Sequence, residues 1–265
     1  MIGIFDSGIG GLTVVREVLD KLPQYRIVYF GDTARTPYGT KSQKTIKEYS
    51  IEDTEFLLAQ GAKVIVVACN SASSVAFDTL RRRFSVPVFE VIRPAVEKAL
   101  GLTRKQRVGI IGTRATIGSG IYERLLKEAR SDVEVFSQPC PLLVPLVEEG
   151  WLSRPETKRI VRKYLSPLKM KQIDTLVLGC THYPLLKSVI EPKMGKRVRV
   201  IDSSQEVALW VKGYLEKHPE VAESLTPTDG QEGHRFFVSD LTPNFEHIAK
   251  QFLGRPIKLE LAGKG

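Results

Sequence analysis

Short runs of apolar residues, rich in valine and isoleucine, recur along the chain and alternate with longer stretches in which apolar positions have helical spacing. Near-continuous apolar runs are typical of strands that are buried on both faces, as the strands of parallel sheets are. We therefore predict eight strands, at Ile2–Phe5, Arg26–Phe30, Lys63–Ala68, Val86–Val91, Arg107–Ile111, Val133–Phe136, Asp174–Leu178 and Val198–Ile201.

The stretches between these runs carry signals for the starts and ends of helices. Ser42–Gly61 has an N-cap residue before its helical pattern and a glycine after it. Another helix is predicted to begin with Pro94 at its first position, a third to follow a capping box at Ser153–Glu156, and a fourth to occupy Ser204–Lys217. The alternation of strands and helices predicts an α/β fold with parallel sheets.

The C-terminal part of the chain has a different pattern. His218–Gly233 is polar and rich in threonine, glycine and proline, which predicts a surface loop. After this loop we predict a strand at His234–Asp240, a helix at Asn244–Leu253 and a last strand within Pro256–Leu261.

Two pairs of strand-end sequences repeat within the chain. VGIIGT at Val108–Thr113 is similar to IGIFDS at Ile2–Ser7, and DTLVLGCTH at Asp174–His182 is similar to KVIVVACNS at Lys63–Ser71. The two offsets, 106 and 111 residues, are nearly equal, and a cysteine falls at the same point in the second pair. Chance resemblance between buried strands is the alternative. The matched cysteines favour a duplication, which predicts two pseudo-symmetric α/β lobes with parallel sheets flanked by helices.

The composition is that of a globular protein. Hydrophobic residues make up 42% and charged residues 26% of the 265 residues, which excludes a disordered chain. The 39 Lys and Arg residues exceed the 30 Asp and Glu residues, giving a net charge of +9. These basic residues are scattered and have no interleaved aromatic residues, so nucleic-acid binding is not supported. Without a signal-peptide pattern or an apolar run near the ~20 residues of a membrane span, we expect a cytoplasmic protein with no membrane partner.

Three cysteines, Cys69, Cys140 and Cys180, are present, and neither their number nor their spacing indicates a disulfide framework or a metal site. Cys69 and Cys180 follow the carboxyl ends of matched strands, where open α/β sheets bind ligands. A helix is expected to begin after each of them, and its N-terminus lowers a thiol pKa. A lone cysteine is more often a buried apolar residue, as we expect for Cys140, but two at matched positions favour a function.

Two thiols that face one cleft from two lobes suit the inversion of a carbon centre. A thiolate removes a proton from one side of the carbon, and a thiol delivers a proton to the other side. The roles of the two groups exchange with the direction of the reaction. The usual thiol pKa, ~8.5, lies far below the pKa of a C–H group, so a thiolate alone is too weak a base. Such a site must also stabilise the carbanionic transition state.

Further candidate residues lie near these strand ends. The glycine-rich turn Asp6–Leu12 could bring backbone close to a ligand carboxylate, but it lacks the third glycine of the dinucleotide-binding pattern. Asp6 itself is either a helix N-cap or a partner for a thiol. His182 could polarise Cys180, whereas Glu148, taken from its sequence context alone, is a solvated charge.

Five motifs then carry a resemblance to a known family. They are DSGIGGLTV at Asp6–Val14, GDTARTPYG at Gly31–Gly39, ACNSAS at Ala68–Ser73, PLVEEG at Pro145–Gly150 and LGCTHYPLL at Leu178–Leu186. In this order and over residues 2–205, they resemble the glutamate racemases of the aspartate/glutamate racemase superfamily. The resemblance implies an enzyme, an isomerase that interconverts L-glutamate and D-glutamate without a cofactor and supplies D-glutamate for peptidoglycan.

The resemblance also implies roles for individual residues. Cys69 would act on the D-enantiomer and Cys180 on the L-enantiomer. Asp6 and His182 would assist these thiols. Asp32 and Glu148 match further acidic positions of the family pattern, and Glu148 is counted among the catalytic residues. The positions that match substrate-binding residues of the family are Asp6, Ser7, Tyr38, Gly39, Asn70, Ser71, Thr113, Thr116, Thr181 and His182. Ser71 stands where the family usually has threonine and keeps the hydroxyl, and Arg93 is also a departure.

The family fold implies an active site in the cleft between two lobes, formed by residues 1–93 with 207–265 and by residues 94–206. Members of the family often form homodimers, which we expect here too. The segment Thr33–Thr40 is a candidate for a loop that closes over the substrate.

Four alternatives remain open. An aspartate racemase of the same superfamily differs only in how the substrate side chain fits. A Cys–His thiol hydrolase would use Cys180 and His182 and would tolerate Cys69→Ser. A nucleic-acid-binding protein explains the charge and leaves the cysteine motifs unexplained. A racemase that depends on pyridoxal phosphate needs a Schiff-base lysine and a phosphate cup, for which no motif is visible.

Overall fold

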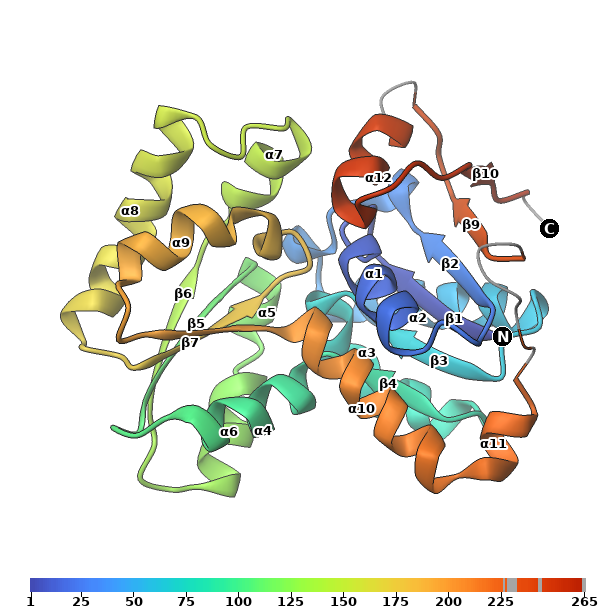
Figure 1. The fold of residues 1–265 in the computed structure, drawn as a ribbon, viewed down its shortest axis with the longest axis horizontal. Coiled ribbons are helices and arrows are strands. Elements are labelled where there is room, and N and C mark those ends of the chain that lie inside the picture. Colours follow the sequence, from blue (N-terminus) through green and yellow to red (C-terminus); the bar gives the residue numbers. More distant parts are fainter. Residues whose placement is uncertain (226, 228–232, 243–244, 264–265) are drawn as a thin grey trace.

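The computed structural model describes residues 1–225, 227, 233–242 and 245–263. It consists of two lobes, each built on a parallel sheet with helices on both faces (Figure 1). The first sheet has the strand order β10-β9-β2-β1-β3-β4 and comprises β1 (Ile2–Asp6), β2 (Ile27–Gly31), β3 (Val64–Val67), β4 (Val88–Glu90), β9 (Arg235–Val238) and β10 (Glu260–Leu261). The second has the order β6-β5-β7-β8 and comprises β5 (Arg107–Gly112), β6 (Glu134–Pro139), β7 (Thr175–Gly179) and β8 (Arg199–Asp202).

The strand order confirms the duplicated α/β architecture. The arrangement β2-β1-β3-β4 of the first sheet has its counterpart in β6-β5-β7-β8 of the second, so that β1 corresponds to β5 and β3 to β7. These are the two strand pairs whose sequences repeat. All eight predicted strands are present, and strands β1, β2, β3 and β7 are buried along their whole length, as their apolar sequences require. The C-terminal strands β9 and β10 extend the first sheet.

The helices cover both sheets. Those of the first lobe are α1 (Leu12–Lys21), α2 (Gln43–Ala59), α3 (Asn70–Arg83), α10 (Ser203–Lys217), α11 (Pro219–Glu223) and α12 (Phe245–Leu253), with the 3-10 turns η1 (Thr33–Arg35) and η2 (Tyr38–Thr40). Those of the second lobe are α4 (Ile92–Leu102), α5 (Arg114–Gly118), α6 (Ile121–Ala129), α7 (Leu143–Glu148), α8 (Pro155–Met170) and α9 (Lys187–Met194), with the turn η3 (Tyr183–Leu186). No helix among the described residues is both long and apolar enough to cross a bilayer.

Helix α2 begins and ends as its sequence predicts. The Ser42 hydroxyl accepts the backbone N–H of Thr45 at 3.2 Å, and Gly61 takes a left-handed φ of 88° just after the helix. The predicted start of α4 at Pro94 is wrong, because the Glu90 carboxylate accepts the N–H groups of Ile92 and Arg93 and so caps the helix earlier.

Three other boundaries also differ from their predictions. The capping box at Ser153–Glu156 is not formed: Arg154 occupies the N-cap of α8 without a side-chain cap, and Pro155, which lacks an N–H, takes the first helical position. Helix α10 begins one residue early, at Ser203, because the Asp202 carboxylate accepts the Ser204 N–H at 2.9 Å. The strand predicted within Pro256–Leu261 is limited to β10.

The segment predicted as a loop at residues 218–233 contains helix α11, which the proline at its first position starts. Residues 226 and 228–232 of that segment lie outside the described residues. The predicted C-terminal helix is present as α12, while Asn244, its predicted first residue, lies outside the described residues.

The chain passes between the lobes twice, once from β4 through α4 to β5 and once from β8 through α10 back to the first sheet (Figure 1). Helices α4 and α10 pack against each other. The lobe boundaries predicted at 93/94 and 206/207 fall within these two helices, and we propose them as the division. The carboxyl ends of β1, β3, β5 and β7 lead into the residues that meet between the lobes.

Candidate active site

The lobes enclose a small cavity where the carboxyl ends of their strands approach each other. Its volume is about 20 Å³, which leaves room for about one water molecule. The first lobe contributes Ser7, Thr36, Pro37, Gly39, Cys69, Asn70 and Ser71, and the second contributes Thr113, Val144, Cys180, Thr181 and His182. Both cysteines of the repeated motifs therefore face one closed site, each from its own lobe.

Cys69 follows strand β3 and is the N-cap residue of helix α3. Its thiol lies 3.5 Å from the Ser7 hydroxyl, and the residue is 5% exposed. Burial raises the pKa of Cys69 to about 12, and the nearby Asp6 carboxylate adds to the increase. The predicted lowering of this pKa by the helix N-terminus is therefore wrong, because loss of solvent outweighs the N–H groups there. At neutral pH Cys69 is a thiol.

Cys180 is equally buried, but its surroundings differ. No α-helix begins directly after it, since the short turn η3 and then α9 follow. Instead, His182 Nδ1 lies 3.8 Å from the Cys180 sulfur, and His182 Nε2 lies 3.0 Å from Glu148 Oε1. Burial lowers the pKa of His182, but hydrogen bonds to Cys180 and Glu148 outweigh it and raise that pKa to about 10. An imidazolium at this position stabilises negative charge on the Cys180 sulfur. Glu148 is thus a partner of His182 and not a solvated charge.

Asp6 lies behind the cavity at the end of β1. Its Oδ1 accepts the Thr181 hydroxyl at 3.3 Å and its Oδ2 accepts the Gly8 N–H at 3.1 Å. Burial raises the pKa of Asp6, although the charge of His182 opposes this. The carboxylate is not a helix N-cap, because Gly11 holds that position in α1.

The glycines of the turn after β1 allow close packing across the cleft. A Cβ atom at Gly10 would lie 2.5 Å from both His182 Cε1 and Thr181 Oγ1, and one at Gly11 would lie 2.4 Å from the Asp6 Cβ. Side chains at these two positions would push His182 and Asp6 out of place. The glycine-rich turn therefore supports the site by leaving room for its side chains.

A group of hydroxyls joins the lobes on the other side of the cavity. Ser71 Oγ lies 2.9 Å from Thr113 Oγ1 and 3.4 Å from Thr116 Oγ1. Beside it, Asn70 Oδ1 accepts the Tyr122 hydroxyl at 2.7 Å. Among the described residues, Asn70 Nδ2 is the one buried side-chain nitrogen or oxygen atom without a hydrogen-bond partner. An amide N–H group is thus available beside the cavity.

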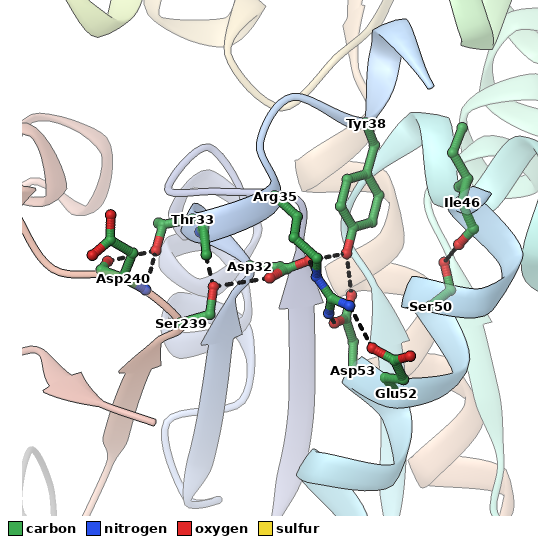
Figure 2. A network of polar contacts seen from close by, with 11 residues as sticks. Asp32, Thr33, Arg35, Tyr38, Ile46, Ser50, Glu52, Asp53, Ser239 and Asp240 are labelled. Atoms are coloured by element: carbon green, nitrogen blue, oxygen red, sulfur yellow. Dashed lines mark hydrogen bonds and ion pairs between the residues drawn. The ribbon is translucent and has the colours of Figure 1, made fainter. Parts of the chain in front are cut away.

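A buried polar network holds the segment 33–40 in place (Figure 2). The Tyr38 hydroxyl donates to Asp32 and lies 2.8 Å from Asp53 Oδ2. Arg35 Nε donates to Asp32 Oδ2 at 2.6 Å, and Arg35 Nη2 donates to Asp53 Oδ1 at 3.2 Å. Burial, followed by the charge of Asp32, raises the pKa of Asp53 well above its usual range. The Tyr38 side chain is engaged here and does not line the cavity.

The C-terminal part of the chain also reaches the site. The Ser239 hydroxyl donates to Asp32 Oδ1 at 2.8 Å, and the Thr33 hydroxyl donates to the Asp240 carbonyl at 2.5 Å (Figure 2). In addition, the Phe252 ring of α12 packs edge-on against His182, with 5.2 Å between the ring centroids. Residues after β9 thus support both the segment 33–40 and the histidine.

Nine of the residues predicted for the site line the cavity: Ser7, Gly39, Cys69, Asn70, Ser71, Thr113, Cys180, Thr181 and His182. Four do not line it, namely Asp6, Tyr38, Thr116 and Glu148, and each of these contacts or adjoins a residue that does. Thr36, Pro37 and Val144 line the cavity without having been predicted. Thr36 and Pro37 fall within the motif GDTARTPYG, whereas Val144 carries no chemical signal.

The chain is similar to known racemases over most of its length. The model of the Asp/Glu/Hydantoin racemase family matches residues 12–209. The glutamate racemase of Geobacter metallireducens is 48% identical over 253 residues, which cover 96% of this chain and 92% of that protein.

Solved structures give the same result. Glutamate racemase isoform RacE1 from Bacillus anthracis superposes with a TM-score of 0.93 at 39% identity and covers 99% of this chain and 97% of that one. Glutamate racemase from Francisella tularensis, solved in complex with D-glutamate, has a TM-score of 0.90 at 37% identity, with the same coverage. The chain therefore belongs to the Asp/Glu/Hydantoin racemase family.

Proposed function

We propose that this chain is a glutamate racemase that interconverts L-glutamate and D-glutamate by proton transfer between the substrate and two thiols. The observation that carries the proposal is the pair Cys69 and Cys180, which face one closed cavity from opposite lobes. The substrate follows from the relatives, which are glutamate racemases over nearly the whole chain. The relative from Francisella tularensis binds D-glutamate.

The charged groups of the site indicate which cysteine removes the α-proton of L-glutamate. Cys180 next to the His182 imidazolium is suited to be the thiolate, and Cys69, with a pKa of about 12, is the thiol. In this form Cys180 removes the α-proton of L-glutamate, and the electron pair of that C–H bond moves into the substrate carboxylate. Cys69 then delivers its proton to the opposite side of the carbon, which gives D-glutamate. The thiol and thiolate have exchanged, and the site is ready for the reverse reaction.

The remaining residues hold the reactants in this geometry. Glu148 keeps His182 charged and oriented through the hydrogen bond to Nε2, and Asp6 fixes the Thr181 hydroxyl. We assign substrate binding to the hydrogen-bonding groups of Ser7, Asn70, Ser71, Thr113 and Thr181, and to the backbone at Tyr38 and Gly39. The hydroxyl groups among these donors can also stabilise the negative charge that develops on the substrate carboxylate during proton removal.

The biological setting follows from the proposed reaction. A glutamate racemase supplies D-glutamate for peptidoglycan, so this chain would act in cell-wall synthesis and the maintenance of cell shape. We also propose that the enzyme is cytoplasmic. A homodimer, which the family resemblance implies, stays a prediction.

The first experiment follows the circular dichroism of L-glutamate with the purified protein in D₂O, without an added cofactor and with L-aspartate in parallel. We expect loss of the optical signal and entry of deuterium at the α-carbon for glutamate alone. Activity on aspartate alone would replace the substrate and keep the mechanism. No change with either substrate, from folded protein, would overturn the proposal.

The second experiment tests the two thiols separately. We expect Cys69→Ser and Cys180→Ser each to abolish racemisation, because a hydroxyl is a much weaker acid than a thiol and cannot take over either transfer. Cys140→Ser is the matched control, since Cys140 is buried outside the cavity and should leave racemisation intact. A Cys69→Ser or Cys180→Ser variant with full racemase activity would overturn the two-thiol mechanism.

A further inference from the structure

Tyr122 lies outside the motifs and outside the set of cavity residues, yet it touches the one unsatisfied amide of the site. We infer that Tyr122 is a positioning residue that orients the Asn70 amide, so that its NH₂ group faces an oxygen of the bound substrate. This inference rests on the proposed racemisation of glutamate, because it assigns a carboxylate oxygen as the group that the amide binds.

Counting donors and acceptors shows why the amide has this orientation. As described, the Tyr122 hydroxyl donates to Asn70 Oδ1, and only the NH₂ group is left without a partner. In the flipped orientation the NH₂ group would donate to the tyrosine oxygen. The buried hydroxyl proton and Oδ1 would then both be unsatisfied, at a cost for each group. Tyr122 therefore selects the orientation in which the site offers a donor, which is what a carboxylate requires.

The place of Tyr122 in the fold fixes its own position. The side chain is 2% exposed and lies over Gly179, the last residue of β7 before Cys180. A Cβ atom at Gly179 would lie 3.3 Å from Tyr122 Cε2 and 3.6 Å from its hydroxyl oxygen. The absence of a side chain at Gly179 thus leaves the space that the tyrosine ring fills. The same ring packs beside the Cys180 strand end and reaches Asn70.

The hydrogen bond also crosses between the lobes. Tyr122 belongs to α6 of the second lobe, and Asn70 is the first residue of α3 in the first lobe. When the lobes separate to admit a substrate, this bond is lost and the amide is free to rotate. Closure of the lobes then orients the Asn70 amide, so that the amide binds the substrate in the closed form.

The test removes only the hydroxyl, in a Tyr122→Phe variant that keeps the ring over Gly179. We expect KM for L-glutamate to rise about fivefold, the effect of one ordinary hydrogen bond, and kcat to change less than about twofold. The reason is that the amide holds the substrate equally in the ground state and the transition state. In an Asn70→Ala background, the same change should raise KM no further, because the tyrosine acts through the amide.

The matched control is Tyr183→Phe, which deletes another buried hydroxyl of the second lobe, one that donates to the Cys140 carbonyl at 3.0 Å. It should lower thermal stability without the rise in KM. Equal KM values for Tyr122→Phe and the wild type would overturn the inference, as would a further rise of KM in the Asn70→Ala background. A wild-type chain that does not racemise glutamate would instead overturn the proposed function, so the two failures are distinct.

Discussion

Cys69 and Cys180 are equally buried, at 5% exposure each, but the charged groups beside them have opposite signs. The Asp6 carboxylate adds to the raised pKa of Cys69, whereas His182, whose pKa is raised to about 10, places a positive charge beside the Cys180 sulfur. Because Glu148 helps to keep His182 protonated, this carboxylate contributes to the difference between the thiols without touching either sulfur. The protonation of His182 therefore depends on Glu148, a residue that does not line the cavity.

We predict that Glu148→Gln lowers the free energy of unfolding more at acidic than at alkaline pH. The folded-state pKa of His182, about 10, lies above the ~6.5 of an unfolded chain. Its stabilising contribution is therefore complete below about pH 6.5 and disappears as the pH rises through the folded-state pKa. Urea denaturation should show a clear difference between wild type and variant at about pH 6 and a small one above about pH 10.

Glu149→Gln is the control for this prediction, because it removes the same charge from the exposed neighbour of Glu148. We expect little change in stability from it at either pH. A Glu148→Gln effect that is the same at both pH values would show that the carboxylate does not act through His182.

At the scale of the elements, helix α2 and the turn η2 are joined by the hydroxyl of Tyr38, which lies between two buried carboxyl groups. One hydroxyl proton cannot serve both Asp32 and Asp53. Burial and the charge of Asp32 raise the pKa of Asp53, which favours a proton on this group and reduces the repulsion between the two carboxyl groups. The segment that lines the cavity at Pro37 and Gly39 rests on this arrangement.

We predict that Tyr38→Phe lowers the free energy of unfolding by about 1–3 kcal/mol, because it leaves buried polar groups without a partner. It should also raise KM, since the segment 33–40 loses its anchor. Asp53→Asn keeps a donor at the same position and should cost less than Tyr38→Phe. Urea denaturation measures the first effect and steady-state kinetics the second. If Asp53→Asn costs more than Tyr38→Phe, Asp53 is ionised in the folded protein and our protonation assignment is wrong.

The predictability of the fold from sequence also differs among its elements. The eight predicted strands coincide with local apolar runs, so all of them could be predicted, including β6, which is not buried. The repeat with its matched cysteines indicated the two lobes. The start of α4 could not be predicted, because it depends on the Glu90 carboxylate folding back onto the helix N-terminus.

Candidate site residues differ in the same way. Residues at strand ends, such as Cys69 and Cys180, are marked by position and chemistry together. Asp53 lies within helix α2, and Tyr122 lies near the start of helix α6. In such helices a polar residue usually faces solvent and an aromatic residue usually faces the core. Only the tertiary structure brings them to Tyr38 and Asn70, so the sequence alone carries no signal for them.

At the scale of the whole molecule, the cavity of about 20 Å³ lies far below the ~300 Å³ at which ordinary ligand pockets begin. The described form is therefore closed, and the lobes must separate to admit glutamate. A substrate held between them contacts both lobes and binds the native state alone. Its binding energy must then stabilise both lobes together.

We predict that D-glutamate at about 100 times its Kd raises the melting temperature of the whole chain by roughly 5–10 °C, in one transition. Differential scanning calorimetry with and without the ligand measures this, with sodium chloride at equal ionic strength as the control. Two transitions of which only one moves would show that the ligand binds a single lobe.

The contacts of Ser239, Asp240 and Phe252 with the site have a consequence for the order in which this enzyme is made. Synthesis runs from the N-terminus, so both cysteines, the histidine and the segment 33–40 leave the ribosome before these supporting residues do. The second lobe can fold early, but the site is complete only when the residues after β9 have joined the first sheet. A nascent chain that already contains every reacting group is consequently still without its finished active site, and activity begins only after those last segments have emerged and folded.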